Sequence, residues 1–271
     1  MNLSLKQLLA LDYCLDFFHK KIKGIRIECV VLYGSATYPG CFIEGISDLD
    51  ILIFSKDAIL SNFAAIAEEI SRAGQGGITQ KPPIILRDHI GDRIEFDLIY
   101  EDISIDCTIM STLMLRREDI LSNIVRDSTE LLIGSILIWG EPVVGQISEC
   151  VTSDVNLFPY YDESIQRERL TAIGQYLYPK MDRIKFMLDR KDIAVIDYFF
   201  RYRPVFLKWI FCYYKQYPVN FYKHLPMQLK WIAQLSSVEI STIMLNSGMA
   251  VDENIRNFIN FYSVKFSEFS D

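Results

Sequence analysis

The chain has 271 residues, of which 50% are hydrophobic, so it is long enough to bury the core of one large domain or two modest ones. No apolar run approaches the length of a membrane-spanning helix, and Asp12 and Asp16 in the amphipathic N-terminal stretch argue against a secretory signal peptide. The expected compartment is therefore the cytoplasm, and the net charge of -7 disfavours a dedicated nucleic-acid binder, whose surface is usually strongly basic.

The first half of the chain alternates predicted helices and strands. In chain order, we expect a helix over 3–20, a strand over 25–33, a loop within 36–47, a strand over 48–54 and a helix over 57–73. The pair Gly34-Ser35 ends the first strand, and Pro82-Pro83 marks an extended stretch after the second helix. Helical residues over 116–134 and a short apolar run over 135–139 complete this half.

Two β-rich runs, RIEFDLIY and ISIDCTIM, are separated only by Glu101-Asp102 and predict a hairpin. Glu-Asp is not a favoured hairpin turn, so the sequence leaves this connection open. If the turn is tight, Asp97 faces Asp106 across the two strands.

The character of the chain changes after Pro142. Residues 145–163 are typical of a loop, and the pattern from about 164 onward is helical. One helix is expected to start at Pro204, because proline suits the first turn; its predicted core face is Val205, Phe206, Trp209, Ile210 and Tyr213. The sequence thus predicts an α+β protein, with a domain of strands and helices over 1–145 and an α-helical domain over 160–271.

Charge is distributed unevenly between these halves. Residues 1–150 carry 22 Asp and Glu against 13 Lys and Arg, whereas residues 167–230 carry 13 basic residues against 5 acidic ones. The basic helices are either solvated faces or a source of positive charge for a polyphosphate.

Asp48 and Asp50 stand at the start of the second strand. Because alternate residues of a strand share a face, both carboxylates project together while Leu49, Ile51 and Ile53 face a core. Adjacent carboxylates repel each other unless a cation neutralises them, and carboxylate oxygens suit magnesium. The pair therefore predicts a divalent-metal site.

Gly34-Ser35 supplies a complementary element. Glycine after a strand lets the backbone approach a phosphate closely, and the serine hydroxyl can donate to phosphate oxygens. A third carboxylate is expected on a neighbouring strand, where Asp106 and Asp97 each lie among apolar residues and are both candidates.

Other candidate chemistries find less support. The six cysteines and three histidines are scattered without the spacing of a zinc site or a disulfide framework, and Cys29 and Cys107 are expected to be core thiols. Lys223 lies between two predicted helices, where it either contacts a triphosphate or is simply exposed.

The string LYGSATYPGCFIEGISDLDILIF resembles the signature of the polymerase-β-like nucleotidyltransferase superfamily, and ISIDCTIM is similar to its third-carboxylate strand. The helical half resembles, in its helical pattern alone, the second domain of small bacterial antibiotic-modifying nucleotidyltransferases of the lincosamide and kanamycin types. This resemblance points to antibiotic resistance. The resemblance implies a mixed sheet with a helical partner domain.

The same resemblance implies two Mg²⁺ ions and transfer of a nucleoside monophosphate from an NTP to a hydroxyl. The preferred case is AMP from ATP. Gly34 and Ser35 would contact phosphate, and Asp48 and Asp50 would bind metal. Asp106 would bind metal or act as the general base; in some such enzymes the helical domain supplies the base instead.

Several acceptors fit these residues. A small molecule is the preferred acceptor, because the acidic first half would suit a cationic drug. A protein or a tRNA is an alternative, as is synthesis of a nucleotide signal. A catalytically inactive nucleotide-binding module is the alternative from another class.

Overall fold

The computed structural model describes residues 3–42, 47–59, 61–74, 82–87, 91–122, 124, 129–220 and 223–270. By its contacts the chain divides into two compact units. The sheet unit comprises Met1–Arg116 and Leu132–Asp154, and the helical unit comprises Arg117–Leu131 and Val155–Asp271. The segment Arg117–Leu131 therefore clusters with the later helices, although it precedes the last part of the sheet unit.

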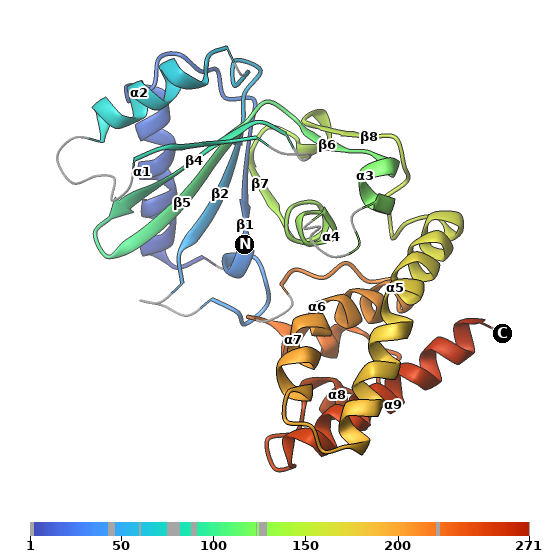
Figure 1. The fold of residues 1–271 in the computed structure, drawn as a ribbon. Helices are drawn as coiled ribbons and strands as arrows, with labels where there is room; N and C mark the ends of the chain where they lie inside the picture. Colours follow the sequence, from blue (N-terminus) through green and yellow to red (C-terminus); the bar gives the residue numbers. More distant parts are fainter. Residues whose placement is uncertain are drawn as a thin grey trace. The chain divides into compact units, whose positions relative to one another are not determined.

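The sheet unit has its elements in the following order (Figure 1): α1 (Leu5–Lys21), β1 (Cys29–Tyr33), the 3-10 turn η1 (Gly34–Ala36), β2 (Leu49–Phe54), α2 (Phe63–Ala73), β3 (Ile84–Leu86), β4 (Arg93–Tyr100), β5 (Ile103–Met110), β6 (Leu113–Leu115), the π-helical segment η2 (Ile133–Ile138), β7 (Glu141–Val144), η3 (Ile147–Glu149) and β8 (Val151–Ser153). Six strands form one sheet in the order β3-β4-β5-β2-β1-β7, and β6 pairs with β8 separately. Within the large sheet β2 and β5 run parallel and the other pairs are antiparallel, so the sheet is mixed. The predicted α+β fold class is confirmed.

One face of the sheet is apolar and is covered by α1 and α2 (Figure 1). Ser4 caps α1 by accepting a hydrogen bond from the Gln7 amide at 3.3 Å, while Ser4 N donates to Gln7 Oε1 at 2.6 Å. Leu49, Ile51 and Ile53 of β2 face this core, as the alternation of the sequence predicts. Consequently, the residues between them face the other side of the sheet.

The hairpin between β4 and β5 is tight. Tyr100 pairs with Ile103 and Asp97 pairs with Asp106, so the register sketched from the sequence is confirmed. The turn uses a left-handed backbone at Glu101, with a φ of 55°. The Lys6 ammonium contacts the Asp102 carboxylate and lies 3.7 Å from Glu101 Oε2, so a basic side chain of α1 neutralises part of this acidic turn.

The helical unit contains α3 (Arg117–Ser122), α4 (Thr129–Leu132), whose last residue falls in the sheet unit, and then α5 (Glu163–Asp189), α6 (Val195–Tyr213), α7 (Leu225–Trp231), α8 (Ser237–Met244) and α9 (Val251–Ser270). Aromatic side chains of α6 and α9 form much of its core. Phe206 packs edge-on against Phe258 and Tyr262, with ring centroids 5.7 and 4.8 Å apart. Phe206 and Trp209 of the aromatic stripe that the sequence showed are therefore core, and Tyr213 is half-buried.

The prediction that a helix starts at Pro204 is wrong, because α6 begins nine residues earlier at Val195 and Pro204 lies inside it. Asp192 closes the turn that precedes the helix: its Oδ1 accepts a hydrogen bond from the Ala194 amide at 3.0 Å, and its carbonyl accepts one from the Val195 amide. Burial of Phe199 against Phe258 then holds the first turns in place.

Element ends also differ from the sequence expectation. The strand expected over 25–33 is paired only from Cys29, and the helix expected over 57–73 starts at Phe63. The stretch expected to be a loop over 145–163 contains η3 and β8, and the sheet has an edge strand, β7, that the sequence pattern did not show. Parts of the expected loop over 36–47 and of the expected helix over 116–134 lie outside the described residues. Among the described helices, none combines the length and apolarity that crossing a membrane requires.

Candidate functional site

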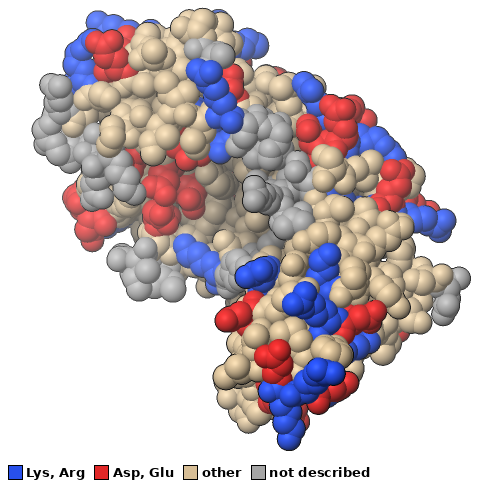
Figure 2. Space-filling model, viewed as in Figure 1, with Lys and Arg blue, Asp and Glu red and all other residues tan. Residues whose placement is uncertain are grey.

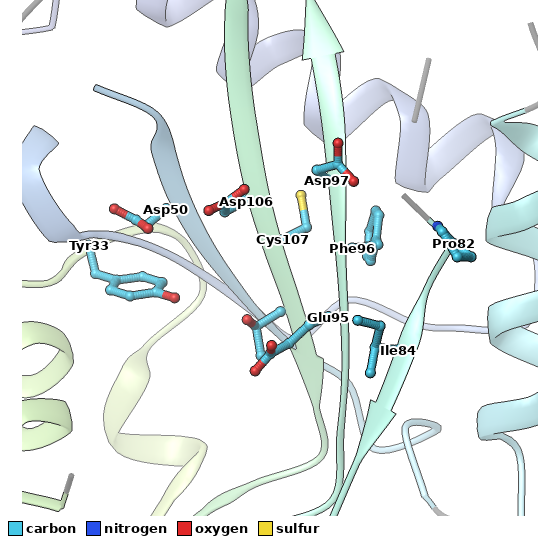
Figure 3. A pocket seen from close by; sticks show the side chains of 10 residues that line it. Tyr33, Asp50, Pro82, Ile84, Glu95, Phe96, Asp97, Asp106 and Cys107 are labelled. Carbon is cyan, nitrogen blue, oxygen red and sulfur yellow. The ribbon is translucent and has the colours of Figure 1, made fainter. Parts of the chain in front are cut away.

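A row of four polar side chains runs across the sheet on the face opposite α1 and α2. The strand register places Tyr33 of β1 beside Asp50 of β2, Asp50 beside Asp106 of β5, and Asp106 beside Asp97 of β4. Figure 3 shows Asp50 and Asp106 next to each other on neighbouring strands. Residues from four strands, distant in sequence, are thus brought into one line by the register alone.

Three of the predicted residues form a compact carboxylate triad: Asp48, Asp50 and Asp106. One carboxylate oxygen from each lies within 4.8 Å of the others. Two ligands of a single magnesium ion lie at most about 4.2 Å apart, since each Mg–O distance is about 2.1 Å. The spacing therefore suits one ion after a small side-chain movement, or two ions that share a carboxylate.

The donor set fits magnesium. All three groups are hard oxygen ligands, and the described triad includes no thiolate or imidazole. Asp97 pairs with Asp106 in the strand register and is buried, but it does not belong to the triad. The third carboxylate of the cluster is thus Asp106, the residue that the sequence favoured.

The position of the Asp50 carboxylate requires a glycine at position 34. Gly34 has a left-handed backbone with a φ of 72°, and a Cβ atom added there would overlap the Asp50 carboxylate. The absence of a side chain lets the carboxylate lie directly over the turn that follows β1. The glycine of the motif therefore leaves the space that the Asp50 carboxylate of the triad occupies.

Ser35 follows in the same turn and is buried, and its Oγ atom has no hydrogen-bond partner among the residues that the structure describes. A buried hydroxyl without a partner costs about 1–3 kcal/mol, so such a group indicates a partner that is absent here. A phosphate oxygen has the chemistry to be that partner. Thr37, by contrast, is satisfied locally, because its amide and its Oγ1 both donate to the Gly34 carbonyl at 3.0 Å.

A cavity of about 290 Å³ adjoins the triad on the β4 side (Figure 3). Asp50 and Asp106 line this cavity together with Glu95 and Asp97 of β4. Glu95 also accepts a hydrogen bond from Arg93 Nε at 2.8 Å. Glu95 is a residue of this cavity that was not predicted from the sequence, although its position two residues before Asp97 on one strand implies a shared face.

The pKa of the Tyr33 phenol reflects the electrostatics of this cavity. Burial raises the pKa of its phenol, and the neighbouring carboxylates of Asp50, Glu95 and Asp106 raise it further, while a hydrogen bond with Thr108 acts in the opposite direction. Figure 2 shows acidic side chains gathered over the sheet of this unit. The sheet face is therefore strongly acidic.

Lys223 belongs to the helical unit and is exposed, with its amide donating to Asn220 Oδ1 at 2.7 Å. Its contact with a triphosphate stays a prediction. Arg203 is buried and donates to the Ile243 carbonyl at 3.0 Å, which is a structural role. Cys29 and Cys107 are buried thiols, as the sequence predicted.

Comparison of the chain with protein-family models and with curated proteins gives no match.

Proposed function

We propose that this chain is a magnesium-dependent nucleotidyltransferase of the polymerase-β-like kind. It transfers a nucleoside monophosphate from an NTP to a hydroxyl of a small molecule and releases pyrophosphate. The preferred nucleotide is AMP. The observation that carries the proposal is the carboxylate triad of Asp48, Asp50 and Asp106, packed against the Gly34-Ser35 turn. A metal site beside a phosphate-binding turn is the arrangement that transfer from a triphosphate requires.

The chemistry is an in-line displacement at the α-phosphorus of the NTP. The acceptor oxygen forms a bond to that phosphorus, and the bond from the phosphorus to the bridging oxygen of the β-phosphate breaks, so pyrophosphate leaves. Asp48 and Asp50 would hold magnesium, which when bound neutralises triphosphate charge and lowers the pKa of the hydroxyl.

The hydroxyl proton needs an acceptor close to the attacking oxygen. Asp106 is the candidate, because its carboxylate is exposed at the cavity end of the triad. Ser35 would donate its unpartnered hydroxyl to a phosphate oxygen, and the Gly34 turn would let the triphosphate approach the backbone.

The observations favour this function over an inactive module. Three like charges held within 4.8 Å repel one another, and such an arrangement persists at a cost unless a cation binds. A macromolecular acceptor has less support: on the face of the helical unit that Figure 2 shows, basic side chains are interspersed with acidic ones. A nucleic-acid surface is expected to be of one sign.

Calorimetry of ATP binding with and without Mg²⁺ tests the donor side of the proposal. We expect binding to require Mg²⁺ in the native protein and to be lost in Asp50→Asn. The matched control is Asp12→Asn. It removes an exposed carboxylate from α1, the helix that covers the sheet face opposite the triad. Equal binding without the metal would contradict the proposal.

Incubation with labelled NTPs, Mg²⁺ and panels of aminoglycosides, lincosamides, tRNA and cell lysate tests the acceptor side. We expect label on a small molecule. Label found only on protein or tRNA would replace the small-molecule acceptor with a macromolecular one, and metal-dependent ATP binding with no transfer to any acceptor would favour the inactive module.

A further inference from the structure

A buried tyrosine outside the triad, Tyr38, contacts the Gly34-Ser35 turn. Burial raises the pKa of its phenol to about 12; a hydrogen bond with the Ser135 hydroxyl lowers this pKa, the Asp50 carboxylate raises it, and a hydrogen bond with the Gly34 backbone lowers it. A backbone hydrogen bond that lowers the pKa of a phenol is donated to the phenol oxygen, so the Gly34 amide is the donor. The Tyr38 oxygen therefore connects the turn to Ser135.

Tyr38 and Thr37 together hold Gly34 in its left-handed conformation. The Gly34 carbonyl accepts hydrogen bonds from the amide and the Oγ1 atom of Thr37, both at 3.0 Å, and the Gly34 amide donates to Tyr38. Both polar groups of a residue with many accessible conformations are thus fixed, at a φ of 72°. Ser35 is the next residue, so the direction of its buried hydroxyl depends on this conformation.

Ser135 belongs to the π-helical segment η2, whose shape is set by two contacts. The Trp139 amide donates to the Gly134 carbonyl at 3.1 Å, a bond that spans five residues, as in a π-helix. Gly140 then lets the chain turn back past the Ile136 carbonyl, which a Cβ atom at this position would overlap. Segments of this kind are rare and frequently occur at functional sites.

η2 holds the Tyr38 side chain at two places. The buried Ser135 hydroxyl bonds to the phenol oxygen, and the Trp139 ring lies edge-on to the Tyr38 ring, with centroids 6.5 Å apart and an angle of 80° between the planes. The ring contact fixes the position of the side chain, and the hydroxyl contact fixes the direction of its oxygen. A series of contacts therefore runs from η2 through Tyr38 to the amide of Gly34.

We propose that Tyr38 and Ser135 are positioning residues of the phosphate-binding turn. Ser135 orients the Tyr38 phenol, the phenol fixes the Gly34 amide, and the fixed turn aims the Ser35 hydroxyl at a phosphate oxygen. Both residues act through the turn and do not touch the substrate. This inference rests on the proposed function for the identity of the ligand, whereas the contacts within the turn are a property of the free protein.

Inorganic tripolyphosphate tests this role, because it presents the phosphate chain without a base or sugar. It is titrated with Mg²⁺ into the full chain by calorimetry. Tyr38→Phe removes the hydroxyl and keeps the ring against Trp139, and we expect it to weaken tripolyphosphate binding about tenfold, as loss of one hydrogen bond to a charged group does. Ser135→Ala should weaken it about threefold, because the phenol keeps its bond to Gly34 and loses its orientation. The double variant should equal Tyr38→Phe, since the two residues act in series.

Two measurements separate positioning from general damage to the fold. Binding of Mg²⁺ alone to the triad should change by less than about twofold in both single variants. The matched control is Tyr262→Phe, which removes a buried hydroxyl that has no hydrogen-bond partner within the described part of the chain, and should leave both affinities unchanged. If Tyr38→Phe does not fold, Ser135→Ala provides the measurement. Undiminished tripolyphosphate binding in the folded variants, additive losses in the double variant, or an equal loss of Mg²⁺ binding overturns the positioning role.

Hydrogen exchange of the Gly34 amide in the ligand-free protein separates this inference from the proposed function. We expect exchange at least about tenfold faster in Tyr38→Phe than in the native protein, because the amide loses its acceptor. If the native protein binds neither tripolyphosphate nor ATP but Gly34 exchange responds, the contacts of the turn stand and the proposed function fails. If ATP binds with Mg²⁺ but Tyr38→Phe changes neither exchange nor tripolyphosphate affinity, the proposed function stands and the positioning role fails.

Discussion

Two clusters of charged side chains, one in each unit, follow opposite principles. In the helical unit Glu130 is buried with Arg169 and Lys208; its carboxylate accepts hydrogen bonds from Arg169 Nε at 2.6 Å and Nη2 at 2.8 Å, and Lys208 Nζ lies 3.5 Å away. In the sheet unit three carboxylates share one site. The first cluster contains its own counter-charges, whereas the second collects charges of one sign.

This difference separates a structural cluster from a functional one. Arg169 also donates to the Ile120 carbonyl, so the Glu130 cluster joins α5 and α6 to the segment Arg117–Leu131. Breaking it should therefore reduce stability and leave the chemistry of the triad intact. Breaking the triad should have the reverse effect, because the mutual repulsion of its carboxylates opposes folding and its removal does not weaken the fold.

The largest expected effect is on activity. Asp50→Ala should lower the rate of nucleotide transfer by about a thousandfold or more, because metal ligation supplies several kcal/mol of transition-state stabilisation. The free energy of unfolding, measured in urea without Mg²⁺, should change by less than about 1 kcal/mol. Undiminished turnover in Asp50→Ala, or in the companion variant Asp48→Ala, would contradict the mechanism.

The next effect is on stability. Arg169→Ala should lower the free energy of unfolding by about 3–5 kcal/mol, because it leaves the Glu130 carboxylate buried without its bidentate partner. The matched control is Arg256→Ala, which breaks the exposed pair with Asp189 at 3.1 Å and should cost less than about 1 kcal/mol. Both are measured by urea denaturation, and equal losses in the two variants would remove the distinction between the clusters.

A smaller effect is expected at Gly34. Gly34→Ala places a Cβ atom where the Asp50 carboxylate lies and adds a left-handed alanine, which costs about 1–2 kcal/mol. Transfer should fall at least about tenfold because Asp50 is displaced from the triad. Gly24→Ala is the control, since its Cβ would lie 3.5 Å from Glu69 Oε2 in ordinary contact; transfer equal to that of this control would show that Gly34 does not shape the site.

The smallest effect is a dependence of stability on pH. Burial acts to raise the pKa of Glu130, but Arg169 and Lys208 outweigh it and bring the pKa below its ordinary value of 4.5. A lowered pKa in the folded state means that the stabilisation is complete above about pH 4.5 and is lost as the pH falls below it. Urea denaturation between pH 7 and pH 3 should show this loss in the native protein and a smaller one in Glu130→Gln.

Much of the site followed from local pattern. The alternation of Asp48 and Asp50 with apolar residues placed both carboxylates on the face opposite the core, because a strand has a period of two. The register of Asp97 with Asp106 followed from a two-residue connection. Glu95 was not predicted because a single glutamate in a strand carries no local sign of function.

The ends of helices and strands were less predictable than the site residues, for physical reasons. Pro204 reads as a helix start, because proline is favoured there, but aromatic burial around Phe199 extends α6 through it. β7 contains Pro142 and shows no alternating pattern; it becomes a strand by pairing with β1 at the edge of the sheet.

By itself, the sequence determined the fold class, the two regions of different composition, the motif residues Gly34, Ser35, Asp48 and Asp50, and two candidates for the third carboxylate. Tertiary structure decided that Asp106 completes the triad, that Gly34 must lack a side chain, and that a cavity lined by Asp97 and Glu95 opens beside them. The reason is that strand periodicity is local, whereas the lateral order of strands and the space between side chains depend on how distant segments pair.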